Sequence, residues 1–215
     1  MKYGIVKFKF IIVIGFAFLS NIAWSQKAGK SPQYFGDPIL TDSLSTIFIP
    51  TRYSQELLSA NKIALWGNYY SNIIVYDYKT DNYKKLFLSD TYVEAFKERQ
   101  RFRDDIVKDN RLSNITDNWV FLLVKNLDYN ENGKIDEDDP SILFVSTIKG
   151  EDLKALTTET INVVSIDIYN EQGFGLIKFQ RDTNNDKSFK KEDNDFYFKK
   201  ISLSSLIFGS AIEIK

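Results

Sequence analysis

Two twelve-residue segments of this sequence carry oxygen-bearing side chains at regular intervals. The first, residues 128–139, has the sequence DYNENGKIDEDD, with six acidic residues and one lysine. Carboxylates, amide carbonyls and backbone carbonyls are the ligands of Ca²⁺, which takes about six to eight oxygens. A loop of this length can surround one such ion with ligands at positions 1, 3, 5, 7, 9 and 12. The segment therefore predicts a calcium site.

Every ligand position of this first loop is filled. The predicted ligands are Asp128, Asn130, Asn132, the backbone carbonyl of Lys134, Asp136 acting through water, and Asp139. Gly133 stands at position 6, where the chain must turn sharply. A plain polar turn rich in Asn and Asp is the simpler alternative, but it does not explain the spacing.

The second loop, residues 182–193, has the sequence DTNNDKSFKKED and matches the first with two departures. Its predicted ligands are Asp182, Asn184, Asp186, the backbone carbonyl of Ser188, and Asp193. Lys187 replaces the glycine at position 6, and a positive φ there costs about 1 kcal/mol for a residue with a side chain. The loop carries four acids and three lysines, a net charge of −1 against −5 in the first loop. We therefore expect it to bind calcium more weakly.

Both loops resemble the calcium loops of the EF-hand and dockerin families, over twelve residues each time. Asp139 and Asp193 close the loops, as is usual in dockerins, where most EF-hands use Glu. The flanking segments, NWVFLLVK before the first loop and SILFVST after it, are rich in β-branched and aromatic residues, unlike the helix pairs of those families. The loops are therefore predicted at the tips of β-hairpins, and a structural role is expected for the metal.

The rest of the chain has the pattern of a β protein. Short apolar runs bounded by Gly, Asn, Asp or Thr predict strands at 47–49, 62–66, 72–78, 83–88 and 118–125 and onward almost to the end. Residues 91–108 lack Gly and Pro, and Thr91 with Glu94 forms a possible capping box. A helix is predicted there.

Internal repeats organise these strands. At an offset of 54, the segment around residues 128–139 matches that around 182–193; at an offset of 70, residues 75–86 match 145–156. Three units result, at 62–88, 118–157 and 173–205. Residues 143–157, with Gly150, Leu156 and Thr157, resemble the repeat of TolB-type β-propellers.

The resemblance to propeller repeats has clear limits. Thr147 or Ile148 stands where those repeats have an acidic residue before the turn, and three units are fewer than the roughly 4–8 blades of an ordinary propeller. The predicted fold class is mainly β, with antiparallel blade-like hairpin repeats that are small or incomplete as a propeller, and a short helical insertion. One domain is expected at residues 44–215.

The first 25 residues are typical of a secretory signal peptide. Lys2, Lys7 and Lys9 precede the apolar run 10–19, and small residues at 23 and 25 predict cleavage before Gln26. An uncleaved N-terminal anchor is the alternative. Residues 26–43 are predicted to be a tether. The protein is thus expected to be exported, to the periplasm, the cell surface or the medium, with no membrane span after cleavage.

Composition narrows the possible chemistry. The chain has no cysteine and no histidine, which excludes disulfides, thiol nucleophiles, Ser-His triads and His-ligated zinc. The formal charge is −1, and removal of three signal-peptide lysines makes it −4. Nucleic-acid binding needs a basic stripe, so no nucleic-acid partner is expected.

Three classes of function remain. The first is a non-catalytic, calcium-bound binding or scaffold module; the TolB-type resemblance implies a protein partner in the cell envelope. The second is a carbohydrate-binding surface protein that uses Trp66, Tyr69 and Tyr70 as a stacking platform. The third is a glycoside hydrolase with paired carboxylates, which is disfavoured because the acids that stand out belong to the calcium loops. We therefore expect no enzyme activity.

Overall fold

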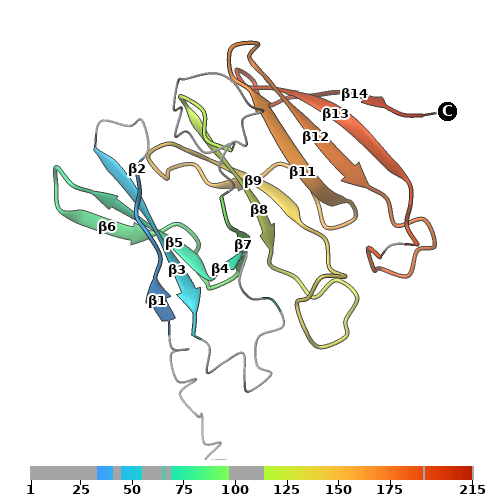
Figure 1. The fold of residues 1–215 in the computed structure, drawn as a ribbon, viewed down its shortest axis with the longest axis horizontal. Coiled ribbons are helices and arrows are strands. Elements are labelled where there is room, and N and C mark those ends of the chain that lie inside the picture. Colours follow the sequence, from blue (N-terminus) through green and yellow to red (C-terminus); the bar gives the residue numbers. More distant parts are fainter. Residues whose placement is uncertain are drawn as a thin grey trace, which may run out of the picture. The chain divides into compact units, whose positions relative to one another are not determined.

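The structure is a computed structural model that describes residues 33–40, 45–54, 65, 69–96, 114–190 and 192–214. Within these ranges the regular structure consists of strands in three antiparallel sheets, without a helix (Figure 1). The predicted signal peptide, most of the predicted strand 62–66 and residues 97–108 of the predicted helix lie outside the described ranges. No helix in the described ranges has the length and apolar character needed to cross a membrane.

The first sheet is built on one long strand. Its members are β1 (Gln33–Phe35), β2 (Ile39–Leu40), β3 (Thr46–Tyr53), β5 (Asn72–Asp77) and β6 (Asn82–Lys85). β1 and β2 pair with one edge of β3, and β5 pairs with its other edge and with β6. This sheet therefore includes residues 33–40 of the predicted tether. Its Gly36 and Pro38 separate two short strands that the local sequence alone did not indicate.

The second and third sheets hold the later strands. The second runs in the order β10 (Lys154–Ala155), β9 (Ile142–Thr147), β8 (Trp119–Lys125), β7 (Tyr92–Glu94) and β4 (Tyr69–Tyr70). The third is a meander of β11 (Asn162–Tyr169), β12 (Phe174–Gln180), β13 (Phe196–Ser202) and β14 (Phe208–Ile212). The predicted antiparallel, blade-like sheets are confirmed.

The sequence repeats correspond to equivalent hairpins. The repeat at an offset of 54 is the hairpin β8–β9 and the hairpin β12–β13. The repeat at an offset of 70 is the hairpin β5–β6 and the hairpin β9–β10. Each of the two sequence repeats therefore corresponds to a β-hairpin that occurs twice in the structure.

Strand β8 explains why its sequence is apolar without alternation. Val120, Leu122 and Val124 belong to a core cluster shared with the first sheet, whereas Phe121 and Leu123 belong to a second cluster shared with the third sheet. Because successive side chains point to opposite faces of a strand, both faces of β8 are buried. β8 thus lies in the middle of the hydrophobic core.

The predicted helix at 91–108 is wrong at its start, because residues 92–94 form strand β7. The Thr91 hydroxyl does not cap a helix; it donates to the Lys125 carbonyl at 2.9 Å. Val93 pairs with Val124 and is fully buried. Burial of Val93 and pairing with β8 outweigh the local capping pattern, since tertiary context overrides propensity.

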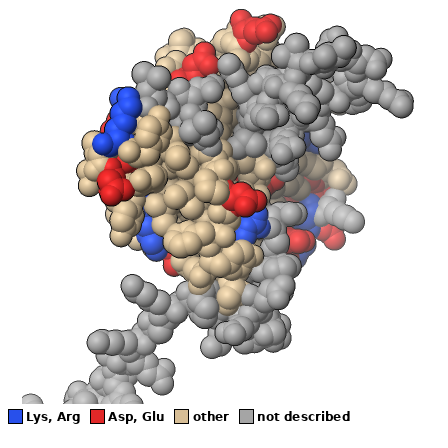
Figure 2. All heavy atoms as spheres, turned by 60° about the vertical axis from the view of Figure 1, so that its left-hand side comes forward, with Lys and Arg blue, Asp and Glu red and all other residues tan. Residues whose placement is uncertain are grey.

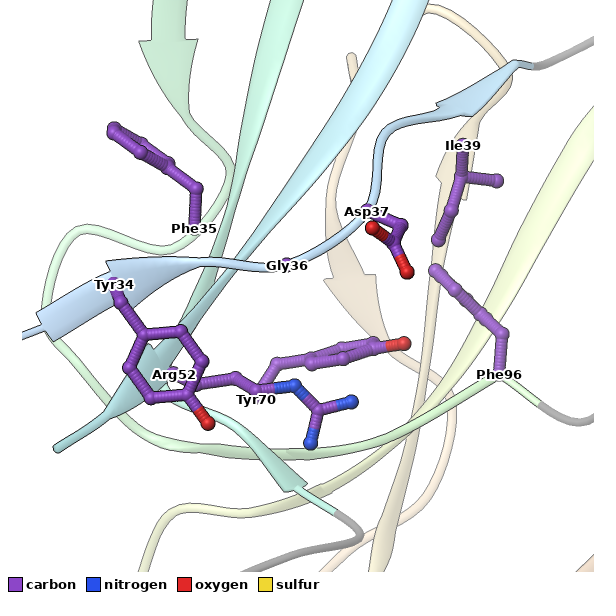
Figure 3. Close-up of a pocket in the computed structure, with 8 residues that line it drawn as sticks. All are labelled: Tyr34, Phe35, Gly36, Asp37, Ile39, Arg52, Tyr70 and Phe96. Atoms are coloured by element: carbon purple, nitrogen blue, oxygen red, sulfur yellow. The ribbon is translucent and has the colours of Figure 1, made fainter. Parts of the chain in front are cut away.

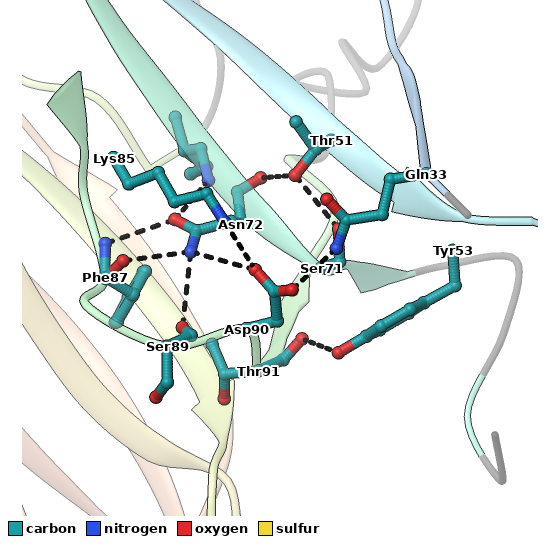
Figure 4. A network of polar contacts seen from close by, with 11 residues as sticks. Gln33, Thr51, Tyr53, Ser71, Asn72, Lys85, Phe87, Ser89, Asp90 and Thr91 are labelled. Carbon is teal, nitrogen blue, oxygen red and sulfur yellow. Dashed lines mark hydrogen bonds and ion pairs between the residues drawn. The ribbon is translucent and has the colours of Figure 1, made fainter. Parts of the chain in front are cut away.

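A buried amide fixes the connection from β6 to β7 (Figure 4). The Asn72 side chain is fully buried, donates to the carbonyls of Phe87 and Ser89 at 3.0 and 3.2 Å, and accepts from the backbone N–H groups of Ile73 and Phe87 at 2.8 and 3.1 Å. Asp90 joins the same network, because it accepts from the Asn72 amide at 3.5 Å and forms an ion pair with Lys85 at 3.0 Å. The contacts of Asn72 and Asp90 therefore hold the segment that links the first sheet to the second.

Replacing this amide should destabilise the fold. Asn72→Ala leaves buried N–H and C=O groups without partners, and we expect it to lower the free energy of unfolding by about 3 kcal/mol. Denaturant unfolding measures the change. Asn82→Ala, at an exposed position on β6, is the control and should cost less than about 0.5 kcal/mol. Equal losses in the two variants would contradict a special role for the Asn72 network.

Candidate metal centres

Both acidic loops connect the two strands of a hairpin, as the sequence predicts (Figure 1). The loop of residues 128–139, here loop one, lies between β8 and β9. The loop of residues 182–193, loop two, lies between β12 and β13. The paired strands hold the two ends of each loop together. The loop therefore loses less conformational entropy when it becomes ordered.

The ligand positions of loop one turn toward the inside of the loop. The Asp128 carboxylate accepts the backbone N–H groups of Asn132 and Gly133 at 3.0 and 2.8 Å. The side-chain oxygen of Asn130 accepts from the Asn132 N–H at 3.1 Å. At the end of the loop, Asp139 accepts the Tyr129 N–H at 2.8 Å. The first and last ligand positions are therefore fixed by the backbone of the loop itself.

Loop two repeats these hydrogen bonds at the equivalent positions. The Asp182 carboxylate accepts the N–H groups of Asp186 and Lys187 at 3.3 and 2.9 Å. Asn184 accepts from the Asp186 N–H at 3.0 Å, and Asp193 accepts the N–H of Thr183 at 2.9 Å. The two loops thus have one conformation, although their sequences differ at position 6.

The backbone dihedral angles confirm the sharp turn predicted at position 6. Gly133 has φ of 87° and Lys187 has φ of 62°, both in the left-handed region. A Cβ atom at Gly133 would meet nothing within 4 Å, so glycine is favoured there by backbone conformation alone. Lys187 adopts the same conformation at the cost of strain, as its sequence position predicts.

Three carboxylates come together in loop two. Oxygen atoms of Asp182, Asp186 and Asp193 lie within 4.8 Å of one another, so this group could hold a metal ion. Loop one has an amide, Asn132, where loop two has Asp186. The larger negative charge of loop one therefore comes from acids outside these three positions and from its having two fewer lysines.

The closing aspartates anchor the loops to the core. Asp139 and Asp193 are 0% and 1% exposed. Burial raises the pKa of Asp193, but the backbone N–H and hydroxyl of Thr183, together with the backbone N–H groups of Lys190 and Asn184, lower it below the usual carboxyl value. Donors of this kind favour the charged form, which is the form that binds a cation.

The donor atoms of the two loops suit a hard cation. All predicted ligands are carboxylate, amide or backbone oxygens, and such ligands select ions of the Ca²⁺, Mg²⁺ and Mn²⁺ class. The Ser188 hydroxyl of loop two is buried and has no hydrogen-bond partner among the described residues. The residues present therefore fit a metal ion of this class.

The two loops contact each other directly. The Phe189 N–H donates to the Asp138 carbonyl at 2.8 Å, and the ring of Phe189 stacks on that of Tyr129 with centroids 6.3 Å apart. Lys187 of loop two forms an ion pair with Glu131 of loop one at 2.8 Å. Sequence spacing does not indicate these contacts, because the residues lie more than 50 positions apart.

Two side chains behind the loops were not predicted from the sequence. The Lys125 ammonium donates to the carbonyls of Glu137, at 3.3 Å, and Asp139. In loop two, the Gln180 side chain likewise donates to two backbone carbonyls, those of Lys190 and Asp193, at 2.9 and 3.0 Å. Burial lowers the pKa of Lys125, opposed by the nearby acids, first among them Asp139. Both residues position the closing end of their loop.

The predicted aromatic platform is not a single surface. Tyr69 and Tyr70 are neighbours in β4 and face opposite sides of the sheet. Tyr69 packs edge-on against Tyr92, whereas Tyr70 is 7% exposed and packs beneath Arg52. Trp66 lies outside the described residues. The platform expected from three adjacent aromatics is therefore wrong for Tyr69 and Tyr70.

Charges are mixed on the face seen in Figure 2. The described Lys and Arg side chains on it lie singly, next to Asp or Glu, and not in a stripe. The expectation of no nucleic-acid partner stays a prediction.

Comparisons with known proteins give limited information. No family model matches the sequence, and no curated protein matches it. Among solved structures, the chain is similar to an oligogalacturonate lyase in complex with manganese, at 9% sequence identity and a TM-score of 0.43. The match covers 84% of this chain and 42% of the lyase chain, so this chain spans less than half the length of that protein. A likeness of this degree carries no argument about activity.

Proposed function

We propose that this chain is an exported, non-catalytic binding or scaffold module in which Ca²⁺ has a structural role in both loops. The observation that carries the proposal is the shared conformation of the loops. In each, the side chains at positions 1 and 12 are fixed by backbone N–H groups of the same loop. Such agreement at the first and last ligand positions is not expected of two unrelated polar turns.

Calcium suits these loops better than the smaller divalent ions. Mg²⁺ requires near-octahedral geometry and keeps several of its waters, whereas Ca²⁺ accepts more oxygens in a flexible arrangement. Loop one offers side chains at positions 1, 3, 5, 9 and 12 and a carbonyl at 7, which supplies that number; loop two offers the same set except at position 9, where Lys190 stands. Bound calcium would neutralise the carboxylates that loop two gathers within 4.8 Å.

A structural role follows from where the loops lie. Loop one belongs to the second sheet and loop two to the third. The Phe189–Asp138 hydrogen bond and the Lys187–Glu131 ion pair join the loops. Ordering both loops therefore strengthens the contact between two sheets. A chain without disulfides gains from such a link, because a ligand that binds only the folded state stabilises it.

Export and the lack of catalysis are part of the same proposal. The signal-like residues 1–25 support export. The acids of the two loops support metal binding in preference to acid–base chemistry, because several accept backbone N–H groups of their own loop. The partner proposed for the module is a protein of the cell envelope, or a glycan.

Calorimetric titration tests calcium binding. The chain without residues 1–25 is treated with chelator, exchanged into chelator-free buffer and titrated with CaCl₂. Two binding events are expected, the tighter lost in Asp128→Ala and the weaker in Asp182→Ala. Asp167→Ala, at an exposed position on β11, is the control and should retain both. Absence of binding at millimolar calcium would overturn the proposal, and the loops would then be polar turns.

The lysine at position 6 of loop two should weaken its calcium site. Lys187→Gln removes one positive charge while keeping a long side chain, and we expect it to tighten calcium binding to loop two about threefold, since a unit charge near the site is worth about 1 kcal/mol or less in water. Titration at low salt measures the effect, and added salt should remove it. Lys154→Gln, on the exposed strand β10, should change nothing. Unchanged affinity in Lys187→Gln would contradict the electrostatic argument.

A further inference from the structure

A second candidate site lies in the first sheet, beside strands β1 and β3 (Figure 3). It is a cavity of about 370 Å³ lined by Tyr34, Phe35, Gly36, Asp37, Ile39, Arg52, Tyr70 and Phe96. Pockets that bind small molecules measure about 300–1,000 Å³ and combine apolar walls with a few polar groups. The cavity has the size and the lining of such a pocket.

One wall of the cavity is a stack of an arginine on a tyrosine. The guanidinium of Arg52 lies 4.7 Å from the centroid of the Tyr70 ring. The Tyr70 ring in turn packs against Phe96, with centroids 6.0 Å apart. Because Tyr70 is buried, this stack is rigidly supported. The stack gives this wall of the cavity a flat, cationic surface.

The N-terminal strands line the cavity beside this stack. Tyr34 is the cross-strand partner of Arg52, and the residue is 46% exposed. The Asp37 side chain extends from the connection between β1 and β2 toward the cavity, as Figure 3 shows. The Gly36 N–H donates to the Pro50 carbonyl at 2.8 Å, which fixes this connection on β3. Aromatic, cationic and anionic groups thus surround one space.

We propose that this cavity binds one ring of a neutral saccharide. An exposed tyrosine ring, Tyr34, offers an apolar face on which the C–H face of a sugar packs. Sugar hydroxyls are donors and acceptors at once, so they can donate to the Asp37 carboxylate, which lines the same cavity as the Arg52 guanidinium. The two side chains have opposite charges, so their sum does not favour an anionic ligand. This site contains none of the calcium ligands.

This site was not predicted from the sequence, although one of its residues, Tyr70, belongs to the predicted aromatic platform. The other lining residues come from the segment expected to be a tether, from β3 and, in the case of Phe96, from the segment after β7. Only the pairing of β1 with β3 brings Tyr34 next to Arg52. The proposal names the ligand of a binding module and does not depend on calcium binding.

A glycan array carrying neutral and acidic oligosaccharides tests the proposal with the chain without residues 1–25. We expect binding to neutral glycans. Calorimetric titration with the best neutral glycan should then show at least tenfold weaker binding for Tyr34→Ala and Asp37→Asn. Tyr83→Ala, an exposed tyrosine on β6, is the matched control and should bind as the parent does. Melting curves of all variants verify that they are folded.

Three results would overturn the proposal. They are no binding on the array, binding confined to acidic glycans, and neutral-glycan binding that survives both Tyr34→Ala and Asp37→Asn. Repeating the titration with Asp128→Ala in chelator separates this proposal from the calcium sites. Saccharide binding that persists there supports the cavity even if calcium binding fails, and calcium binding without saccharide binding overturns the cavity alone.

Discussion

Removing calcium from the chain without residues 1–25 is expected to lower its melting temperature by about 10–20 °C. A ligand present at one hundred times its dissociation constant stabilises the folded state by about 2.7 kcal/mol, so two sites give about 5 kcal/mol. For a domain of this size, about 1 kcal/mol corresponds to roughly 2–4 °C. Thermal unfolding followed by circular dichroism, in excess calcium and in chelator, measures the difference.

Single variants should divide this stabilisation between the loops. Asp128→Asn and Asp182→Asn each remove one carboxylate. Asp128→Asn should abolish more than half of the calcium-induced shift and Asp182→Asn less than half, because loop two is expected to bind calcium more weakly. If the loops cooperate through the Phe189–Asp138 and Lys187–Glu131 contacts, either variant removes more than half. Asp167→Asn, an exposed residue of β11, should leave the shift intact. Equal melting temperatures in calcium and chelator would show that the metal, if bound, does not stabilise the sheets.

The sequence predicts those features whose information is local. The loops are recognisable because their ligand spacing and the turn at position 6 are properties of twelve consecutive residues, and Lys187 has the positive φ that its position requires. The hairpins are recognisable because strand, turn and strand follow one another in the chain. The repeats add further support, because each hairpin occurs in two copies.

Features that depend on distant residues are not predicted. Thr91 and Glu94 form a helix-start pattern, but pairing of Tyr92 with Lys125 and burial of Val93 make the segment a strand. The contact between the two loops and the cavity beside Arg52 also arise from strand pairing. Tyr34 lies in a segment without a recognisable pattern and meets Arg52 only through β1–β3 pairing.

Gly150 tests the contact between the first and second sheets. Gly150 lies in the turn from β9 to β10 with φ of 66°. A Cβ atom there would lie 2.5 and 2.8 Å from the two methyl groups of Val75, a buried residue of β5. Valine is stiff at χ1, so its methyl groups cannot move away freely. Glycine is required both by the backbone and by this close approach.

We expect Gly150→Ala to lower the free energy of unfolding by about 4 kcal/mol, combining about 1–2 kcal/mol for an unfavourable φ with about 1–3 kcal/mol for overpacking. Gly173→Ala is the matched control. Gly173 has φ of 70° in the turn from β11 to β12, and a Cβ there would meet nothing within 4 Å. It should lose only the first contribution, so the difference between the two variants measures the Gly150–Val75 contact.

A double-mutant cycle makes the assignment to Val75 specific. Val75→Ala removes the two methyl groups that the new Cβ would meet, so Gly150→Ala should cost less in that background than in the parent, and the coupling should be about 1–3 kcal/mol. Urea unfolding of the four proteins provides the values. Losses that add without coupling, or equal losses for Gly150→Ala and Gly173→Ala, would mean that the turn does not pack on Val75 and that its glycine serves the backbone alone.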